Sequence, residues 1–124
     1  MKAIVHSDQP LEEWRAGVRT RMHVSAINGA TQLCIFEQWV APDVGAPTHS
    51  HVVEEVLTVI EGEADIWVDE THTAVARGSS VIIPAGRKHG FHNSGSEILH
   101  VQAILASASF EASFDSGSIQ RWLL

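Results

Sequence analysis

The stretch PTHSHVVEE, residues 47–55, decides how the rest of this chain is interpreted. Its two histidines stand two residues apart. In a β-strand such residues project from the same face, about 7 Å apart at the backbone. His49 and His51 can therefore present two imidazoles side by side to one metal ion. Glu55 begins the apolar run EVLTVI, where a buried carboxylate is costly without a positive partner. A divalent cation would supply that partner.

A second stretch, GSSVIIPAGRKHGFHN at residues 78–93, adds a third histidine to this set. Pro84 and Gly86 predict a sharp turn after an apolar strand. His89 then begins the next strand, where an inward side chain reaches the barrel interior. His92 alternates with His89 and is expected to face away from the metal. The predicted ligands are His49, His51, Glu55 and His89.

The whole chain has the pattern of an all-β barrel. Helical periodicity is nearly absent, and short β-rich runs are separated by Gly, Pro, Asn and Asp. The expected strands span residues 3–6, 18–28, 31–41, 49–53, 55–60, 63–68, 72–76, 80–83, 89–92 and 98–106. Turns are expected at Asn28-Gly29 and Asp69-Glu70. A short helix is expected at residues 11–16, and the tail 107–118 is expected to cross the surface before Trp122, Leu123 and Leu124 dock.

Composition restricts the class of protein. A length of 124 residues suits one domain with one hydrophobic core, so we expect residues 1–124 to form a single domain. A formal net charge of −7, with only 8 scattered Lys and Arg, argues against a nucleic-acid partner. No apolar run is long enough to span a bilayer, and residues 1–10 lack a signal-peptide pattern. We therefore expect a cytoplasmic protein with no membrane partner, and Cys34 is expected to be a core residue.

Together the two stretches resemble the two sequence motifs of the cupin superfamily. The motifs cover roughly residues 45–62 and 78–93, and the gap between them is about the shortest that the family uses. The second motif matches at every defining position, whereas the first places Gly45 closer to His49 than the usual pattern does. The matching residues read Gly45-x3-His49-x-His51-x3-Glu55-x6-Gly62 and Gly78-x5-Pro84-x-Gly86-x2-His89-x3-Asn93.

The resemblance implies a jelly-roll β-barrel that holds one divalent transition metal on the four predicted ligands. The family spacing favours Glu55 over its neighbour Glu54 as the carboxylate. Three imidazoles and a carboxylate suit Fe(II) and Mn(II), and they do not exclude Ni, Cu, Zn or Co. Three other histidines have a simpler interpretation as core or surface residues: His6, His23 and His72.

Residues on facing strands are expected to line a substrate pocket. In the strand 99–104, simple burial would turn Leu99, Val101 and Ala103 inward. Similar proteins often face the other parity toward the metal, which would place His100 and Gln102 in the pocket. The remaining expected pocket residues are Phe36, Gln38 and Phe91, with Glu37 and Trp39 outside. Arg19 and Arg21 either lie on the surface or reach an anionic substrate at the barrel mouth.

An open metal site in such a barrel supports several functions. The favoured prediction is an oxygenase acting on a small organic substrate such as a diketone, phenol or thiol, because oxygenation is the commoner activity of small cupins with all four ligands. His100 or Glu55 would move a proton. The alternatives are a redox-neutral isomerase, lyase or cyclase, and a non-catalytic binding module. A homodimer is expected, since pairing would cover strand edges and aromatics such as Trp39 and Trp67.

Overall fold

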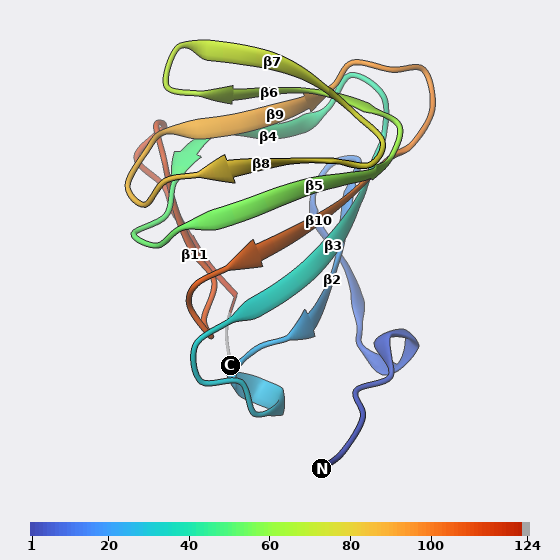
Figure 1. Cartoon of the computed structure of the whole chain (residues 1–124), viewed down its shortest axis with the longest axis vertical. Coiled ribbons are helices and arrows are strands. Elements are labelled where there is room, and N and C mark those ends of the chain that lie inside the picture. Colours follow the sequence, from blue (N-terminus) through green and yellow to red (C-terminus); the bar gives the residue numbers. More distant parts are fainter. Residues whose placement is uncertain (123–124) are drawn as a thin grey trace.

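Alternating apolar and polar residues build two antiparallel sheets that face each other and enclose the core (Figure 1). The computed structural model describes residues 1–122, so the expected docking of Leu123 and Leu124 lies outside the described residues. The architecture is a two-sheet jelly-roll barrel, as the sequence predicts. Its strands are β1 (Leu11–Arg15), β2 (Val18–Val24), β3 (Cys34–Val40), β4 (Gly45–Ser50), β5 (Glu55–Glu61), β6 (Glu63–Val68), β7 (Thr71–Ala76), β8 (Ser79–Ile83), β9 (His89–Asn93), β10 (Leu99–Leu105), β11 (Glu111–Phe114) and β12 (Ile119–Arg121).

The order of strands gives each motif one strand in each sheet, and it pairs β4 with β9 and β5 with β8. The first sheet runs β1-β2-β3-β10-β5-β8, and the second runs β12-β11-β4-β9-β6-β7. Strands β3, β5 and β10 lie together in the first sheet and each alternates strictly between buried and more exposed residues. Their inward side chains, such as Leu57 and Val101, are almost completely buried. Each such side chain contributes about 1.5 to 3 kcal/mol of hydrophobic free energy.

The N-terminal region differs from the prediction. The expected helix at residues 11–16 is wrong, because Leu11–Arg15 is the edge strand β1 and pairs with β2. So short a segment cannot recover the entropy of helix nucleation, whereas an adjacent strand offers it a ready ladder of hydrogen bonds. The expected strand at residues 3–6 is also absent, and a 3-10 turn (η1, His6–Asp8) stands near its end.

The C-terminal region is more ordered than predicted. The tail expected to cross the surface instead forms the hairpin of β11 and β12, and β11 extends the second sheet by pairing with β4. The expectation that this tail crosses the surface was wrong. Its residues Phe110, Ala112 and Phe114 alternate with polar residues, which is the pattern of a β-strand with one buried face. Phe110 and Ala112 are buried. The hairpin therefore closes one end of the barrel interior.

The turns follow the residues that tolerate unusual backbone angles. Asp69 has φ 53° in the connection between β6 and β7, as expected. Asn28-Gly29 does not form a two-residue hairpin; it ends a 3-10 turn (η2, Ala26–Asn28), where Gly29 has φ 112°. Cys34 is fully buried in the core, as predicted. Within residues 1–122 the helices are single 3-10 turns, so no helix there could span a bilayer.

Candidate metal centre

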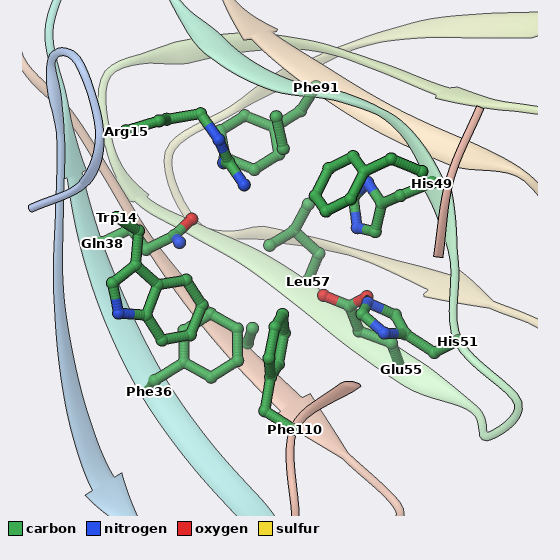
Figure 2. Close-up of a pocket in the computed structure, with 13 residues that line it drawn as sticks. Trp14, Arg15, Phe36, Gln38, His49, His51, Glu55, Leu57, Phe91 and Phe110 are labelled. Carbon is green, nitrogen blue, oxygen red and sulfur yellow. The ribbon is translucent and has the colours of Figure 1, made fainter. Parts of the chain in front are cut away.

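Four side chains with metal-binding atoms meet in the barrel interior. His49 lies near the end of β4, His51 follows β4 directly, and Glu55 and His89 are the first residues of β5 and β9. One ligand atom from each residue lies within 4.8 Å of the others. All four side chains are buried, with exposed fractions between 2% and 7%. Figure 2 shows how His49, His51 and Glu55 turn toward the same part of the cavity.

The pairing of strands explains this convergence. His49 and His89 are register partners across β4 and β9, which places their rings 4.3 Å apart. The turn before β9 is held against the loop after β4, because the Gly86 amide donates to the His51 carbonyl at 2.7 Å. Gly86 has φ 79°, a conformation that favours glycine. The tight turn at Gly86 thus brings the second stretch of sequence onto the first.

Hydrogen bonds to the backbone orient all three imidazoles. The Nδ1 atoms of His49, His51 and His89 lie 2.7, 2.7 and 3.0 Å from carbonyl oxygens. A carbonyl only accepts, so each Nδ1 carries a proton, and in the neutral ring Nε2 is then the nitrogen whose lone pair can bind a metal ion. Such outer contacts fix both the tautomer and the ring orientation of metal-binding histidines. The accepting carbonyls belong to Pro47, Glu111 and Arg87, respectively.

Glu55 supplies the negative charge of the cluster. Its Oε1 atom lies 3.0 Å from His89 Nε2 and 3.2 Å from His51 Nε2. Burial alone would raise the pKa of Glu55, but its contacts with the imidazoles of His51 and His89 lower it to about 2. Burial and the charge of His89 lower the pKa of His49 to about 4. The carboxylate is thus ionised and His49 is neutral near pH 7, which are the forms that bind a cation.

The donor set fits a divalent transition metal. Three imidazole nitrogens and one carboxylate oxygen match the intermediate ligand preferences of these ions, whereas Mg²⁺ and Ca²⁺ prefer oxygen donors alone. A buried anionic Glu55 is also stabilised by a cation at the centre of the cluster. Glu54, the alternative carboxylate, is exposed and lies outside the cluster. His92 is partly exposed and likewise is not part of it.

Three residues of the cluster, His49, His51 and Glu55, form one side of a narrow cavity. Its free volume is about 20 Å³, which is room for about one water molecule. The structure places Phe36, Gln38 and Phe91 on its wall (Figure 2). Gln38 donates from its side-chain amide to Thr20 Oγ1 at 3.1 Å. The wall is mainly aromatic and aliphatic, so water is largely excluded around the cluster.

The placement of His100 and Gln102 in the pocket is wrong. The inward residues of β10 are Leu99, Val101 and Ala103, because burying that apolar face is worth more than burying an imidazole and an amide. His100 instead lies on the outer face of the sheet. Its Nε2 lies 2.6 Å from Glu37 Oε1, and its ring stacks on Trp39 with centroids 4.8 Å apart.

The arginines that the sequence singled out also lie outside the barrel. Arg19 is exposed, and Arg21 is partly buried and donates to the backbone carbonyl of Gln9. Both line a groove on the outer face of the first sheet, beside Trp39. Neither reaches the cavity that contains the metal cluster. The surface interpretation of these two residues therefore agrees with the structure.

The cavity also has four lining residues from the two ends of the chain that were not predicted from the sequence. A β-bulge in β1 turns both Trp14 and Arg15 toward the interior, and no residue pattern announces that bulge. Phe110 and Phe114 come from the C-terminal hairpin. The signal for them was the apolar alternation from 110 to 114. These residues close the side of the cavity that the two motifs leave open.

Comparison with known sequences identifies the domain that carries the two motifs. A sequence model of the cupin domain (Cupin_2) matches residues 36–105, more than half of the chain. Auxin-binding protein 1 of Arabidopsis thaliana is 29% identical over 111 residues, which cover 81% of this chain and 56% of that protein. The chain spans about half the length of the curated relatives it matches.

Solved structures show the same fold. The polyketide cyclase RemF from Streptomyces resistomycificus aligns with a TM-score of 0.77 at 22% identity, covering 100% of this chain and 87% of that chain. A variant of oxalate decarboxylase from Bacillus subtilis aligns with a TM-score of 0.77 at 18% identity, covering 93% of this chain and 31% of that chain. At such identities the likeness concerns the fold alone.

Proposed function

The chain belongs to the cupin family, and we propose that it is a metal-dependent oxygenase that acts on a small organic substrate. The observation that carries the proposal is the buried convergence of three imidazoles and one carboxylate beside an apolar cavity. The spatial cluster unites residues up to 40 positions apart in the chain, His49 and His89. In each histidine the Nδ1 atom is held by a backbone carbonyl, which leaves Nε2 as the metal-binding atom.

The four cluster residues would hold one divalent ion, with Fe or Mn favoured and Ni, Cu, Zn or Co as alternatives. When bound, the ion would act as a Lewis acid and, if it is Fe or Mn, would supply the redox chemistry of oxygenation. The Gln38 carbonyl oxygen is available to accept a hydrogen bond from substrate, because the amide nitrogen donates to Thr20. Phe36 and Phe91 would exclude water from the reacting groups.

Glu55 is the residue that we propose as the proton acceptor. With His100 on the outer face, Glu55 is the carboxylate that lines the cavity within residues 1–122. Its low pKa keeps it ionised near neutral pH but makes it a weak base while both imidazole contacts persist. Release of one of its two imidazole contacts would raise its basicity. Proton transfer is thus assigned to the cluster itself.

The test combines metal analysis with oxygen uptake. Metal content is measured on freshly purified protein and after reloading with Fe(II) or Mn(II), and each form is then given diketones, phenols and thiols in an oxygen electrode. The proposal expects substrate-dependent oxygen consumption that requires the metal. Turnover without oxygen consumption would replace it with a redox-neutral reaction. Tight metal binding without any turnover would indicate a binding module.

A cyclase is the second candidate, and the likeness to a polyketide cyclase over the entire chain favours it. In that case the metal would only polarise a carbonyl group of the substrate. Auxin-binding protein 1, whose name describes a binding activity, supports the third class. Product analysis by mass spectrometry separates the three classes. An oxygenase adds oxygen atoms to the compound, a cyclase leaves its mass unchanged or removes water, and a binding module leaves the compound unchanged.

We also propose that the protein is a cytoplasmic homodimer. Leu11 and Ile98 are 43% and 51% exposed and line an outer groove with Trp39, which a second copy would cover. The reduced thiol of Cys34 is compatible with the cytoplasm. Light scattering after gel filtration is expected to give twice the mass of the chain. Trp39→Glu is expected to give monomers, and a monomeric starting protein would contradict the proposal.

A further inference from the structure

Arg15 brings a positive charge to the wall of the cavity that contains the metal cluster (Figure 2). It is the last residue of β1, and the register between β1 and β2 shifts between Glu13 and Arg15. Beyond this bulge Arg15 pairs with Val18, which is fully buried, so both belong to the inner face of the sheet. Bulges often re-aim a side chain in this way beside functional sites.

This guanidinium has no acidic partner among residues 1–122. Its contacts there are neutral: one terminal nitrogen donates to Gln120 Oε1 at 3.2 Å, and the group lies 5.5 Å from the centroid of the Phe114 ring. Burial lowers the pKa of Arg15, and no nearby carboxylate offsets this effect. An arginine stays protonated in spite of burial. A cation that has lost part of its water without gaining an anion is stabilised by any anion that enters the cavity.

The surrounding wall is suited to the rest of a small acid. Trp14, Phe36 and Phe110 pack around one another with ring centroids 4.8 to 5.5 Å apart. They give the cavity flat apolar surfaces beside the guanidinium. The planar fork of Arg15 can donate two parallel hydrogen bonds to a carboxylate, which a neutral amide cannot accept in the same way.

We propose that Arg15 binds the carboxylate of a small organic acid where the narrow cavity meets an outer recess of about 350 Å³ that Arg15 also lines, and thereby selects acidic substrates for the metal site. The inference rests on the proposed function, because it takes the cluster as the place where the acid reacts. The alternative is a structural role in which Arg15 only fastens the C-terminal hairpin through Gln120 and Phe114. The two roles differ in what happens when the Gln120 contact alone is removed.

The test is calorimetric titration with matched acids and amides. Acetate, benzoate and phenylacetate are compared with acetamide, benzamide and phenylacetamide, on zinc-loaded protein and on protein stripped of metal. At least one acid is expected to bind tighter than its amide by about 10-fold or more, the size of a hydrogen bond to a charged group. Arg15→Gln is expected to reduce that preference by about 10-fold in both forms, and Arg15→Lys to retain part of it.

Gln120→Ala is the matched control, because it removes the same contact and leaves the cation in place. It is expected to keep the preference for the acid, with its melting temperature showing any loosening of the hairpin. The proposal is overturned if no acid is preferred, if Arg15→Gln keeps the full preference, or if Gln120→Ala loses as much as Arg15→Gln.

Metal content separates this inference from the proposed function. If the protein holds no metal but prefers acids through Arg15, the oxygenase proposal fails and the carboxylate site stands. If the protein holds metal and turns over neutral compounds as fast as acids, the oxygenase proposal stands. Unchanged turnover of those acids in Arg15→Gln would then reject the role of Arg15 in selecting the substrate.

Discussion

Two carboxylate–histidine clusters lie on opposite faces of the first sheet. Inside the barrel, Glu55 contacts the Nε2 atoms of His51 and His89. On the outer face, Glu37 contacts the Nε2 atoms of His23 and His100. The side-chain pairing is the same in both, one glutamate between two imidazoles. The surroundings of the imidazoles make the two clusters chemically different.

The two clusters differ in the hydrogen bonds of the imidazole Nδ1 atoms. In the inner cluster every Nδ1 donates to a backbone carbonyl, and a third histidine, His49, adds its Nε2 to the same point. In the outer cluster the Nδ1 of His23 has no hydrogen-bond partner within the described residues. Directional support of the rings therefore distinguishes a metal centre from a hydrogen-bonded ion pair.

A further histidine near the outer cluster does not change this conclusion. His6 could add a third ligand beside His23 and Glu37, and the ligand atoms are close enough. The rings of His6 and His23, however, stack at 3.7 Å with an angle of 10° between their planes. Lone pairs of imidazole nitrogens lie in the ring plane, so those of stacked rings run parallel and do not converge on one ion. We expect the outer cluster to hold no metal.

The largest expected effect is on metal retention. His89→Ala removes a ligand from the inner cluster and leaves Glu55 short of a partner, so it is expected to abolish metal binding. The loss should exceed the 10- to 100-fold that is typical of removing an outer-shell partner of a metal ligand. His100→Ala, the equivalent change in the outer cluster, is expected to retain full metal content. Elemental analysis after gel filtration measures both.

His72→Ala is the surface control for this pair of variants. His72 is exposed, and its ring contacts the carboxylate of Asp65 and the ring of Trp67, which both lie outside the two clusters. Two outcomes would contradict the assignment of the two clusters. One is loss of metal in His100→Ala, and the other is a metal content in His89→Ala equal to that of His72→Ala.

The inner cluster could be predicted from the sequence, and the outer one could not. The i, i+2 spacing of His49 and His51 restricts both rings to one face whatever the rest of the fold. His100 carries no such restriction, because its direction depends on which parity of β10 is buried. Leu99 and Val101 decide that parity through their burial, and the family resemblance pointed the other way.

The rest of the cavity depends on contacts between distant parts of the chain. Arg15 reaches the interior through a bulge, which is a property of the pairing of β1 with β2 and leaves no composition signature. The C-terminal hairpin illustrates the opposite case, since the alternation from Phe110 to Phe114 was readable and the Ser-rich composition obscured it. Pairing partners are therefore the information that a single sequence lacks.

The second prediction concerns support for the inner cluster from the C-terminal hairpin. Phe110 is 5% exposed and contacts the rings of Trp14 and His51, whose Nδ1 donates to the Glu111 carbonyl. Phe110→Ala is expected to lower the free energy of unfolding by about 3 to 5 kcal/mol, as for other buried aromatics. It should also weaken metal binding, because the carbonyl that orients His51 shifts.

Trp39→Ala is the outer counterpart, since Trp39 stacks on His100 but is only partly buried. We expect a smaller loss of stability and unchanged metal affinity. Denaturant unfolding and metal titration of the two variants give the comparison. Equal metal affinity in Phe110→Ala and the parent protein would show that the hairpin does not orient the site.

The smallest effect is expected from the outer carboxylate and depends on pH. Partial burial would raise the pKa of Glu37, but hydrogen bonds from His23 and His100 outweigh it and lower the pKa below 4.5. The stabilisation from Glu37 is therefore present above about pH 4.5 and is lost as the pH falls through its lower folded-state pKa. Glu37→Gln should cost about 1 to 2 kcal/mol at pH 7, and the difference from the parent should shrink toward pH 3.

His23 adds a second limb to the same curve. Burial lowers the pKa of His23 below 6.5, so the unfolded chain binds a proton that the folded chain does not, and stability falls below about pH 6.5. Glu37→Gln is expected to deepen this limb, because Glu37 raises the pKa of His23, and to flatten the more acidic one. Asp65→Asn, in an exposed ion pair with His72, is the control and should change stability by less than about 0.5 kcal/mol. If both variants give the same curve in urea unfolding between pH 3 and 8, the outer cluster is no more than a surface ion pair.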